Sequence, residues 1–443
     1  TNNSYVTVSD VNELEGLPEA DIQKAAALAE RTGAKGQYRF NMQRPSCNPV
    51  LQYAKNRDLR RRVYEMYNNR CNHADQYDNK TISAQIVALR LEMANLMGYK
   101  TFADMQLETR MAKKPENVYN LLDQIWKPAV EAAERELDDI RMMMRKDGIK
   151  GEPKPWDYMY YLDKAKQEKF NISEAEVSQY LEINNVIQGI FWTANKLYGL
   201  SFRERTEDYP QYHKQQQSWD VIDKKGNLIA IFYSDYYPRD GKGAGAWCGR
   251  FRPQSYDGAM RVQPIVTNVC NMTLPTEEGG PALQTVDNVL TMFHEFGHAL
   301  HSFFRDVQYE GTGGVERDFV ELPSQINEHW AFEPEVLRQY ARHYRTGEVI
   351  PQELVEKIDA SSKYGQGFAT VEYLAASYVD LDLHYLTEMP KKLDVMKFQA
   401  EKMRKRGMPS QILPRYSVTN FSHTMGGGYS AGYYSYIWAE VLD

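Results

Sequence analysis

Two histidines and a glutamate lie close together in residues 291–304, TMFHEFGHALHSFF. His294 and His298 are four residues apart, so on a helix their side chains share one face, one turn apart. Two imidazoles at this spacing can bind one zinc ion at about 2.0–2.1 Å. Glu295 flanks the same face, where it can take a proton from water without binding the metal. The pattern H-E-x-x-H therefore predicts a zinc site suited to metal-assisted hydrolysis.

The same five residues also fit a simpler arrangement, in which both histidines are hydrogen-bonded on a buried helix face. The neighbouring apolar residues favour the metal site, because a metal-dependent hydrolase needs this helix inside the protein; they are Val286, Val289, Leu290, Phe293 and Leu300. His301 is seven residues from His294, about 10.5 Å along a helix axis. One ion cannot bind all three histidines, so His301 is expected to support the site or the fold instead.

The third metal ligand must come from another element, because His294 and His298 alone do not complete a zinc site. Residues 315–332 follow a glycine-rich turn and are predicted to be helical, with a bend at Pro323. This segment offers four carboxylates, which are Glu316, Asp318, Glu321 and Glu328. Each of them also fits a solvated helical side chain, and spacing alone does not choose the ligand.

The elements that position these residues are predicted to be mostly helices. Apolar periodicity predicts helices within 83–100, 114–148 and 173–200. Pro115 suits a first helical turn, and Pro128 is expected to kink the second helix. Ser173 followed by Glu176 is a capping box that should open the third helix, and Gly199 should end it.

A short β region is predicted just before the histidine segment. Residues 218–223 and 228–234 have the composition of two strands around a Lys-Gly-Asn turn, and 261–272 are a third candidate. The glycine-rich stretch 238–250 is expected to be a mobile loop. A phosphate-binding loop is disfavoured there because no helix-forming segment follows it.

The composition is that of an ordinary globular protein, with 443 residues, 42% hydrophobic and 26% charged. A net charge of −7 without a basic run argues against a nucleic-acid partner, and no apolar run reaches the roughly 18 residues that cross a bilayer. The cysteines form no CxxC pair and are predicted to be free thiols in a reducing compartment; they are Cys47, Cys71, Cys248 and Cys270. We expect a cytoplasmic protein, or a periplasmic one if a signal peptide was removed before Thr1.

The combined motifs resemble the thimet oligopeptidase family of zinc metallopeptidases, and most closely its bacterial peptidyl-dipeptidase (dipeptidyl carboxypeptidase) branch. The resemblance covers nearly the whole chain, and the motifs that carry it are FWTANKLYG, NVCNM, FHEFGHALH, ERDFVELPSQINEHW and HTMGGGYSAGYYSYIW. The resemblance implies one Zn²⁺ ion held by His294, His298 and Glu321, with Glu295 as the general base. Asp318 lies one turn before Glu321, and we expect it to orient one of the metal ligands without binding the metal itself.

The resemblance also implies that the C-terminal Gly/Tyr segment supplies His423, Tyr429 and Tyr436 as catalytic residues. Independently of it, the glycines 426–428 can form a loop that changes shape around a substrate. Tyr429, Tyr433 and Tyr436 recur at helical spacing, which is also typical of simple packing. The resemblance favours Tyr429 and Tyr436 as hydrogen-bond donors to the oxyanion, and leaves Tyr433 as a packing residue.

The fold implied is mainly α and zincin-like, with a small β-sheet beside the HExxH helix and two helical lobes around a deep channel. We expect 1–443 to be a metallopeptidase catalytic region and a central fragment of a longer enzyme. Within it, 1–200 is a mainly helical lobe portion, 201–275 the sheet region, and 276–443 the zinc-binding and substrate-binding helices. We also expect a monomer.

The expected activity is zinc-dependent release of C-terminal dipeptides from short unstructured peptides. One alternative is an endo-acting oligopeptidase of the same family. Another is a zinc-stabilised peptide-binding fragment without turnover.

Overall fold

The computed structural model describes residues 4–275 and 280–443. The chain forms two compact units, and neither is continuous in sequence. The first unit comprises residues 1–170, 316–319 and 361–438, and the second comprises 171–315, 320–360 and 439–443. The short piece 316–319 belongs to the first unit, although the chain on both sides of it belongs to the second.

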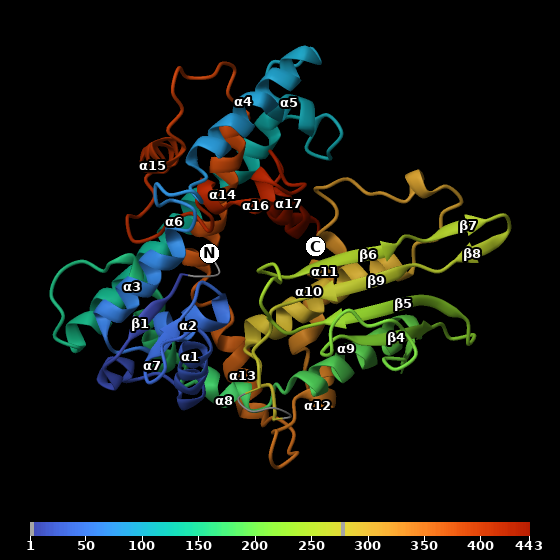
Figure 1. The fold of residues 1–443 in the computed structure, drawn as a ribbon, viewed down its shortest axis with the longest axis horizontal. Coiled ribbons are helices and arrows are strands. Elements are labelled where there is room, and N and C mark those ends of the chain that lie inside the picture. The colour runs from blue at the N-terminus through green and yellow to red at the C-terminus, as the bar shows by residue number, and fades with distance from the viewer. Residues whose placement is uncertain (1–3, 276–279) are drawn as a thin grey trace. The chain divides into compact units, whose positions relative to one another are not determined.

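The first unit is helical apart from a short two-stranded ladder of β1 (Val6–Val8) and β2 (Tyr38–Phe40). Its α-helices are α1 (Glu19–Arg31), α2 (Arg44–Tyr53), α3 (Arg57–Asn68), α4 (Lys80–Leu96), α5 (Phe102–Leu107), α6 (Pro115–Lys146), α7 (Tyr158–Phe170), α14 (Gln366–His384), α15 (Val395–Lys405), α16 (Ser422–Met425) and the first half of α17 (Ser435–Leu442). The long helices α6 and α14 pack together at its centre (Figure 1). Gly367 allows this, because a Cβ there would lie 2.4 Å from the backbone nitrogen of Ala133.

Most predicted helices are present, with changes at their ends. Pro115 is in the first turn of α6 as predicted, and α6 runs without a break through Pro128. Gly199 ends α9 (Ile183–Tyr198) in a left-handed conformation, with φ of 71°. The predicted capping box at Ser173 is wrong, because Ser173 makes no side-chain cap hydrogen bond and precedes only the short α8 (Glu174–Ser178).

The second unit contains a mixed sheet with strand order β3-β4-β5-β9-β6 (Figure 1). The strands are β3 (Ser201–Glu204), β4 (Gln217–Ile222), β5 (Leu228–Asp235), β6 (Trp247–Arg252) and β9 (Ile265–Val269), and a separate ribbon is formed by β7 (Ser255–Asp257) and β8 (Met260–Val262). The predicted strands over 218–223 and 228–234 are confirmed as β4 and β5. The third prediction, 261–272, is divided between β8 and β9. The prediction of a loop over 238–250 is wrong at its end, because residues 247–250 belong to the edge strand β6, which was not predicted.

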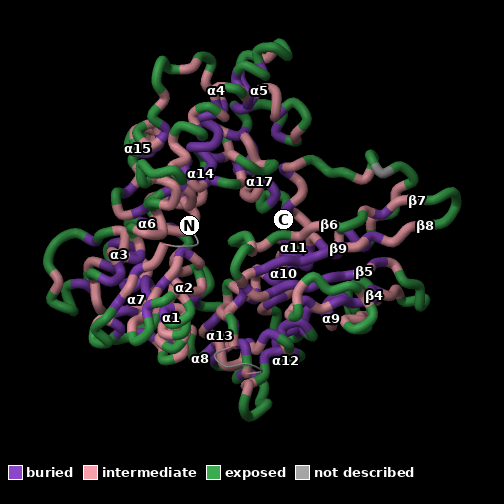
Figure 2. The backbone as a smooth tube through the Cα atoms, in the orientation of Figure 1, coloured by how far each residue is buried: buried purple, intermediate pink, exposed green. Residues whose placement is uncertain are grey.

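Two helices pack on this sheet, α9 (Ile183–Tyr198) and α10 (Val286–Phe303). The core between α10 and the sheet is aromatic, since Phe296 contacts the rings of Phe191, Phe202 and Phe232. Buried residues dominate α10 and the strand β9 beside it (Figure 2). A mainly helical fold with a small sheet beside the histidine segment is therefore confirmed.

The rest of the second unit is helical. The short α8 precedes the sheet, and α11 (Leu322–Glu328), a 3₁₀ turn at His329–Phe332, α12 (Pro334–Tyr340) and α13 (Gln352–Ser361) follow α10. The prediction of one bent helix over 315–332 is wrong: residues 315–321 are not helical, and Pro323 begins α11 rather than bending it. Proline suits this first turn because its missing N–H would have no partner there.

No helix among the described residues has the length and apolar character to cross a membrane. The four cysteines are free thiols.

Candidate metal centre

Helix α10 positions the two histidines that were predicted to bind metal. Thr285 caps its start by accepting a hydrogen bond from the Asn288 backbone N–H at 3.1 Å. The apolar face of α10 packs on the sheet, where Asn268 donates to the backbone carbonyl of Glu295 at 2.8 Å. His294 and His298 lie on the partly open side, one turn apart.

The third carboxylate arrives on the segment that leads into α11. Gly297 lets α11 approach closely, because a Cβ there would lie 2.5 Å from the carbonyl oxygen of Pro323 and 2.6 Å from the Cα of Ser324. The side-chain amide of Asn327 also ties α11 to α10 by donating to the Phe293 carbonyl at 2.6 Å. This contact places Glu321, the residue that precedes α11, against the two histidines.

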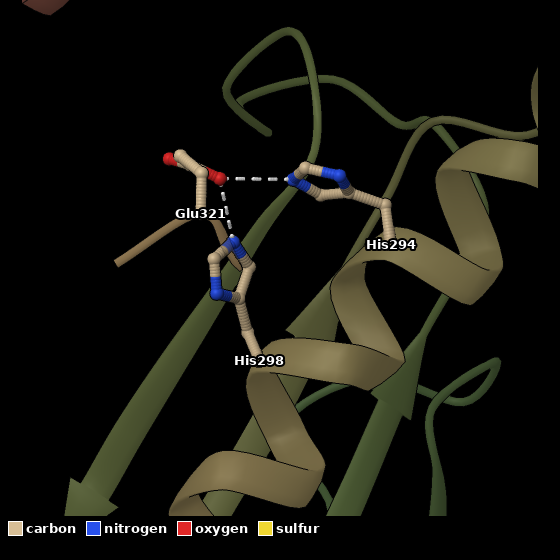
Figure 3. A group of neighbouring side chains, drawn as sticks. All are labelled: His294, His298 and Glu321. Atoms are coloured by element: carbon tan, nitrogen blue, oxygen red, sulfur yellow. Dashed lines mark hydrogen bonds and ion pairs between the residues drawn. The ribbon is translucent and has the colours of Figure 1, made fainter. Parts of the chain in front are cut away.

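His294, His298 and Glu321 bring their ligand atoms within 4.8 Å of one another (Figure 3). The Oε2 atom of Glu321 lies 3.2 Å from Nε2 of His294 and 3.1 Å from Nε2 of His298. Donor atoms that each lie about 2.1 Å from a tetrahedral zinc ion are separated by about 3.4 Å. The observed spacing and the two-nitrogen, one-oxygen donor set therefore fit a metal ion.

The side chains of the site differ in their exposure. His294 and His298 keep 19% and 17% of their side-chain surface exposed, whereas Glu321 keeps 2%. The group is therefore exposed on the side of its two imidazoles and closed on the side of Glu321. Burial opposes ionisation of Glu321, but hydrogen bonds with His294 and His298 hold its pKa well below the usual range.

Glu295 is buried on the same helix and does not belong to the ligand group. Its side-chain atom Oε2 is buried without a hydrogen-bond partner among the described residues. Burial raises the pKa of Glu295, while the neighbouring His294 and His298 act in the opposite direction. A buried carboxylate oxygen without a hydrogen-bond partner is unusual in folded proteins.

The other predicted candidates lie elsewhere. His301 is half-buried on α10 and is not part of the ligand group, as the helix spacing required. Glu316 is exposed. The prediction that Asp318 orients a ligand is wrong, because its carboxylate accepts hydrogen bonds from the backbone N–H groups of Met111 and Ala112 and from the Tyr434 hydroxyl.

Glu328, rather than Asp318, contacts one of the predicted metal ligands without belonging to the ligand group. Its Oε1 atom lies 2.6 Å from Nδ1 of His294. Burial alone would lower the pKa of His294, but the hydrogen bonds with Glu321 and Glu328 raise it to about 10. A carboxylate at Nδ1 keeps the proton on that nitrogen and directs Nε2 toward the metal. Glu328 is seven residues after Glu321. This spacing could not identify Glu328 from the sequence alone, because it depends on α11 beginning at Leu322.

We predict that Glu328→Gln weakens metal binding by about 10- to 100-fold, the usual effect of losing an outer partner of a ligating histidine. The amide can still contact Nδ1, but it no longer carries the negative charge that stabilises the imidazole N–H. Competition with a chromophoric chelator measures the affinity, and Glu316→Gln is the control because Glu316 is an exposed acid of the same chain region. Equal affinities for both variants would contradict this role of Glu328.

The remaining predicted catalytic residues, His423, Tyr429 and Tyr436, lie in the first unit. The rings of Tyr429 and Tyr436 are stacked, with centroids 5.3 Å apart, and His423 lies 6.0 Å from Tyr429. The predicted helical spacing of the tyrosines is wrong, because α17 begins at Ser435 and includes only Tyr436. Tyr433 is buried among Ala376 and Phe421, which agrees with a packing residue.

Comparisons with known proteins found related sequences along the chain. The profile of peptidase family M3 matches residues 50–443. The chain is 37% identical to the dipeptidyl carboxypeptidase of Escherichia coli (strain K12) over 441 residues, covering 99% of this chain and 64% of that protein. It is 35% identical to oligopeptidase A of the same organism over 447 residues, covering 98% of this chain and 65% of that protein. The chain thus spans less than two-thirds of the length of these relatives.

A solved structure named for oligoendopeptidase F has a related fold. It superposes with a TM-score of 0.50 at 12% identity, covering 91% of this chain and 60% of that one. At this identity the likeness concerns the fold alone. The extent of the family match, together with the identity to full-length relatives, shows that the chain belongs to peptidase family M3.

Proposed function

We propose that this chain is the catalytic region of a zinc-dependent peptidase that hydrolyses short unstructured peptides. The observation that carries the proposal is the convergence of His294, His298 and Glu321 beside the buried carboxylate of Glu295. Structural zinc sites use four protein ligands, whereas three leave a position open for water and substrate. Zinc bound there supplies a Lewis acid that makes water nucleophilic near neutral pH and polarises the peptide carbonyl.

Glu295 is the proposed general base and acid. Its carboxylate takes a proton from the attacking water and then gives this proton to the amine that leaves. Burial supports this role, because a raised pKa makes the carboxylate a stronger base than an exposed glutamate. The unpaired Oε2 atom leaves an acceptor available for the proton.

Tyr436 is the proposed donor to the oxyanion of the scissile carbonyl, together with Tyr429 or His423. The assignment rests on the resemblance of the segment HTMGGGYSAGYYSYIW to the corresponding family motif. A phenol hydroxyl or an imidazole N–H can donate to developing negative charge, and such donors are worth about 10²–10³ in turnover.

The edge strand β6 is the proposed guide for the substrate backbone. It pairs with β9 on one side only and is the last strand of the sheet. It also contacts α10, the helix that carries the histidines. An extended peptide can pair with such a free edge through main-chain hydrogen bonds, which align the peptide without requiring a particular sequence.

Release of C-terminal dipeptides is the favoured activity, and an endo-acting oligopeptidase is the second candidate. The first follows from the resemblance and from the identity to a dipeptidyl carboxypeptidase. The second is retained because oligopeptidase A has almost the same identity to this chain. The two activities differ in whether the substrate's terminal carboxylate takes part in recognition.

A matched pair of short peptides, one with a free and one with an amidated C-terminus, separates these activities. We expect the zinc-loaded chain to remove dipeptides stepwise from the free peptide and to slow strongly on the amidated one, because the amide lacks the recognised charge. Mass spectrometry of the digests gives both the rate and the position of cleavage. Internal cuts at equal rates would assign the oligopeptidase activity, and no cleavage by the zinc-bound chain would overturn the enzymatic function.

A further inference from the structure

The glycine loop of the Gly/Tyr segment lies between two fixed ends. Gly426, Gly427 and Gly428 are exposed, while the residues before and after them are partly or fully buried. The loop closes on itself through the Tyr429 backbone N–H, which donates to the His423 carbonyl at 3.0 Å. A side chain that holds the backbone before or after the three glycines therefore also helps to hold His423 and Tyr429 in position.

The end after the glycines is held by one buried carboxylate. Asp380 on α14 is 1% exposed, and its oxygens accept hydrogen bonds from the backbone N–H groups of Ala431, Gly432 and Tyr433 at 3.0, 2.9 and 3.0 Å. Ala431 adopts a left-handed conformation with φ of 50°, which residues with a side chain rarely adopt. This conformation turns three successive N–H groups toward one anion, as in the backbone nests that bind anions in other proteins.

The end before the glycines is held by an arginine. Arg90 on α4 donates from its guanidinium to the carbonyl of Thr424 at 2.7 Å and to that of Met425 at 3.1 Å. These two carbonyls immediately precede Gly426. A planar guanidinium can hold both at once, which a lysine ammonium on its flexible stem cannot do with the same geometry.

His384 joins the carboxylate and the arginine into one unit. Its Nδ1 atom lies 2.8 Å from the Asp380 carbonyl and 3.0 Å from Oδ1 of Asp380, and its Nε2 atom lies 2.9 Å from the Arg90 guanidinium. Arginine only donates, so Nε2 must accept and Nδ1 must carry the proton. Phe102 packs against the imidazole, with ring centroids 5.1 Å apart.

We propose that Asp380, His384 and Arg90 are positioning residues that hold the catalytic Gly/Tyr segment in its working shape. The proposal rests on the proposed function, because it assigns a purpose to the geometry of His423 and Tyr429. None of the three touches the substrate in this proposal; they act through the backbone at residues 424–425 and 431–433. Glycines leave the loop free to deform, so its shape depends on these two anchor points.

Asp380→Asn tests the proposal. The variant keeps the size of the side chain but replaces one acceptor oxygen with an NH₂ group, which faces the N–H groups of residues 431–433. We expect kcat to fall by about 10- to 100-fold, because small misplacements of catalytic groups have effects of this size. Zinc content is expected to stay the same, because Asp380 is not part of the metal-binding group.

Glu136→Gln is the matched control for loss of stability. Glu136 is also a buried carboxylate that accepts two backbone N–H groups, those of Gly367 and Phe368, at 2.8 and 2.9 Å. These lie at the start of α14, outside the Gly/Tyr segment. We expect a comparable loss of thermal stability and an unchanged kcat when both variants are measured well below their melting temperatures. Equal kcat values for the two variants would overturn the proposal.

A second variant, Arg90→Lys, and a second measurement, hydrogen exchange, test the proposal independently of the kcat of Asp380→Asn. Arg90→Lys should lower kcat in the same manner as Asp380→Asn. In the Asp380 variant, the amides of Ala431, Gly432 and Tyr433 should exchange faster, while those of Gly367 and Phe368 keep their protection. If the parent chain does not cleave peptides, the proposed function fails, and exchange still decides whether Asp380 fixes the segment; unchanged exchange at residues 431–433 would refute that.

Discussion

Glu295→Gln is expected to slow peptide hydrolysis by about 10²–10⁴-fold, the usual contribution of general acid–base catalysis. Glutamine has nearly the same shape as glutamate but cannot accept a proton from water. The metal-binding group comprises His294, His298 and Glu321, so zinc should remain bound. Steady-state kinetics on a short peptide, with metal content measured in the same sample, separate a loss of proton transfer from a loss of metal.

The control for this variant is His301→Gln. His301 lies on the same helix and is half-buried, but it is not part of the ligand group. It should therefore retain zinc and most of the activity. Full activity in the Glu295 variant with zinc bound would show that another group moves the proton, and the role proposed for Glu295 would have to be abandoned.

The centre of the metal site could be predicted from sequence because it depends on local geometry. His294 and His298 follow from the four-residue repeat of a helix, and the same repeat correctly excluded His301. Glu321 required the family resemblance. The contact that brings it to the histidines depends on Gly297 and on where α11 begins, and neither follows from the spacing of four carboxylates.

The wrong predictions share a cause, which is that contacts distant in sequence outweighed local patterns. Asp318 had a plausible spacing for a ligand's partner, yet its carboxylate is used by Met111 and Ala112, more than 200 residues away in the chain. The tyrosines looked helical by spacing, but the N–H groups of residues 431–433 turn toward Asp380 instead of continuing a helix. Local periodicity contains no information about such buried anions.

The edge strand β6 was missed for a different reason. Its sequence WCGRFR follows a glycine-rich stretch, contains a glycine and alternates poorly, so it lacks the usual signs of a strand. It forms because β9 offers a partner for all of its residues except Phe251, where the register shifts. Edge strands exposed on one face often lack a clear hydrophobic pattern, because only one of their sides is constrained by a neighbour.

Glu321→Gln is expected to weaken zinc binding by more than about 100-fold, beyond the effect of losing an outer partner, and to abolish hydrolysis. The carboxylate supplies the negative charge of the ligand set, and a neutral amide oxygen is a much weaker donor to a dication. Burial opposes protonation of His294, but hydrogen bonds with Glu321 and Glu328 raise its pKa to about 10. Zinc must therefore displace a proton from His294 at neutral pH, so the affinity of the parent chain should rise as the pH increases toward 10.

Thermal unfolding with and without zinc measures both effects. Zinc at about 1,000 times its dissociation constant stabilises a protein by about 4 kcal/mol, so the parent chain should show a clear upward shift in Tm. The Glu321 variant should show almost none, and the shift in the parent should be larger at pH 8 than at pH 6. Glu316→Gln, at an exposed acid five residues earlier, should behave as the parent does. A full zinc-dependent shift in the Glu321 variant would mean that the ion is held by other residues, and the hydrolytic site would then have to be sought elsewhere in the chain.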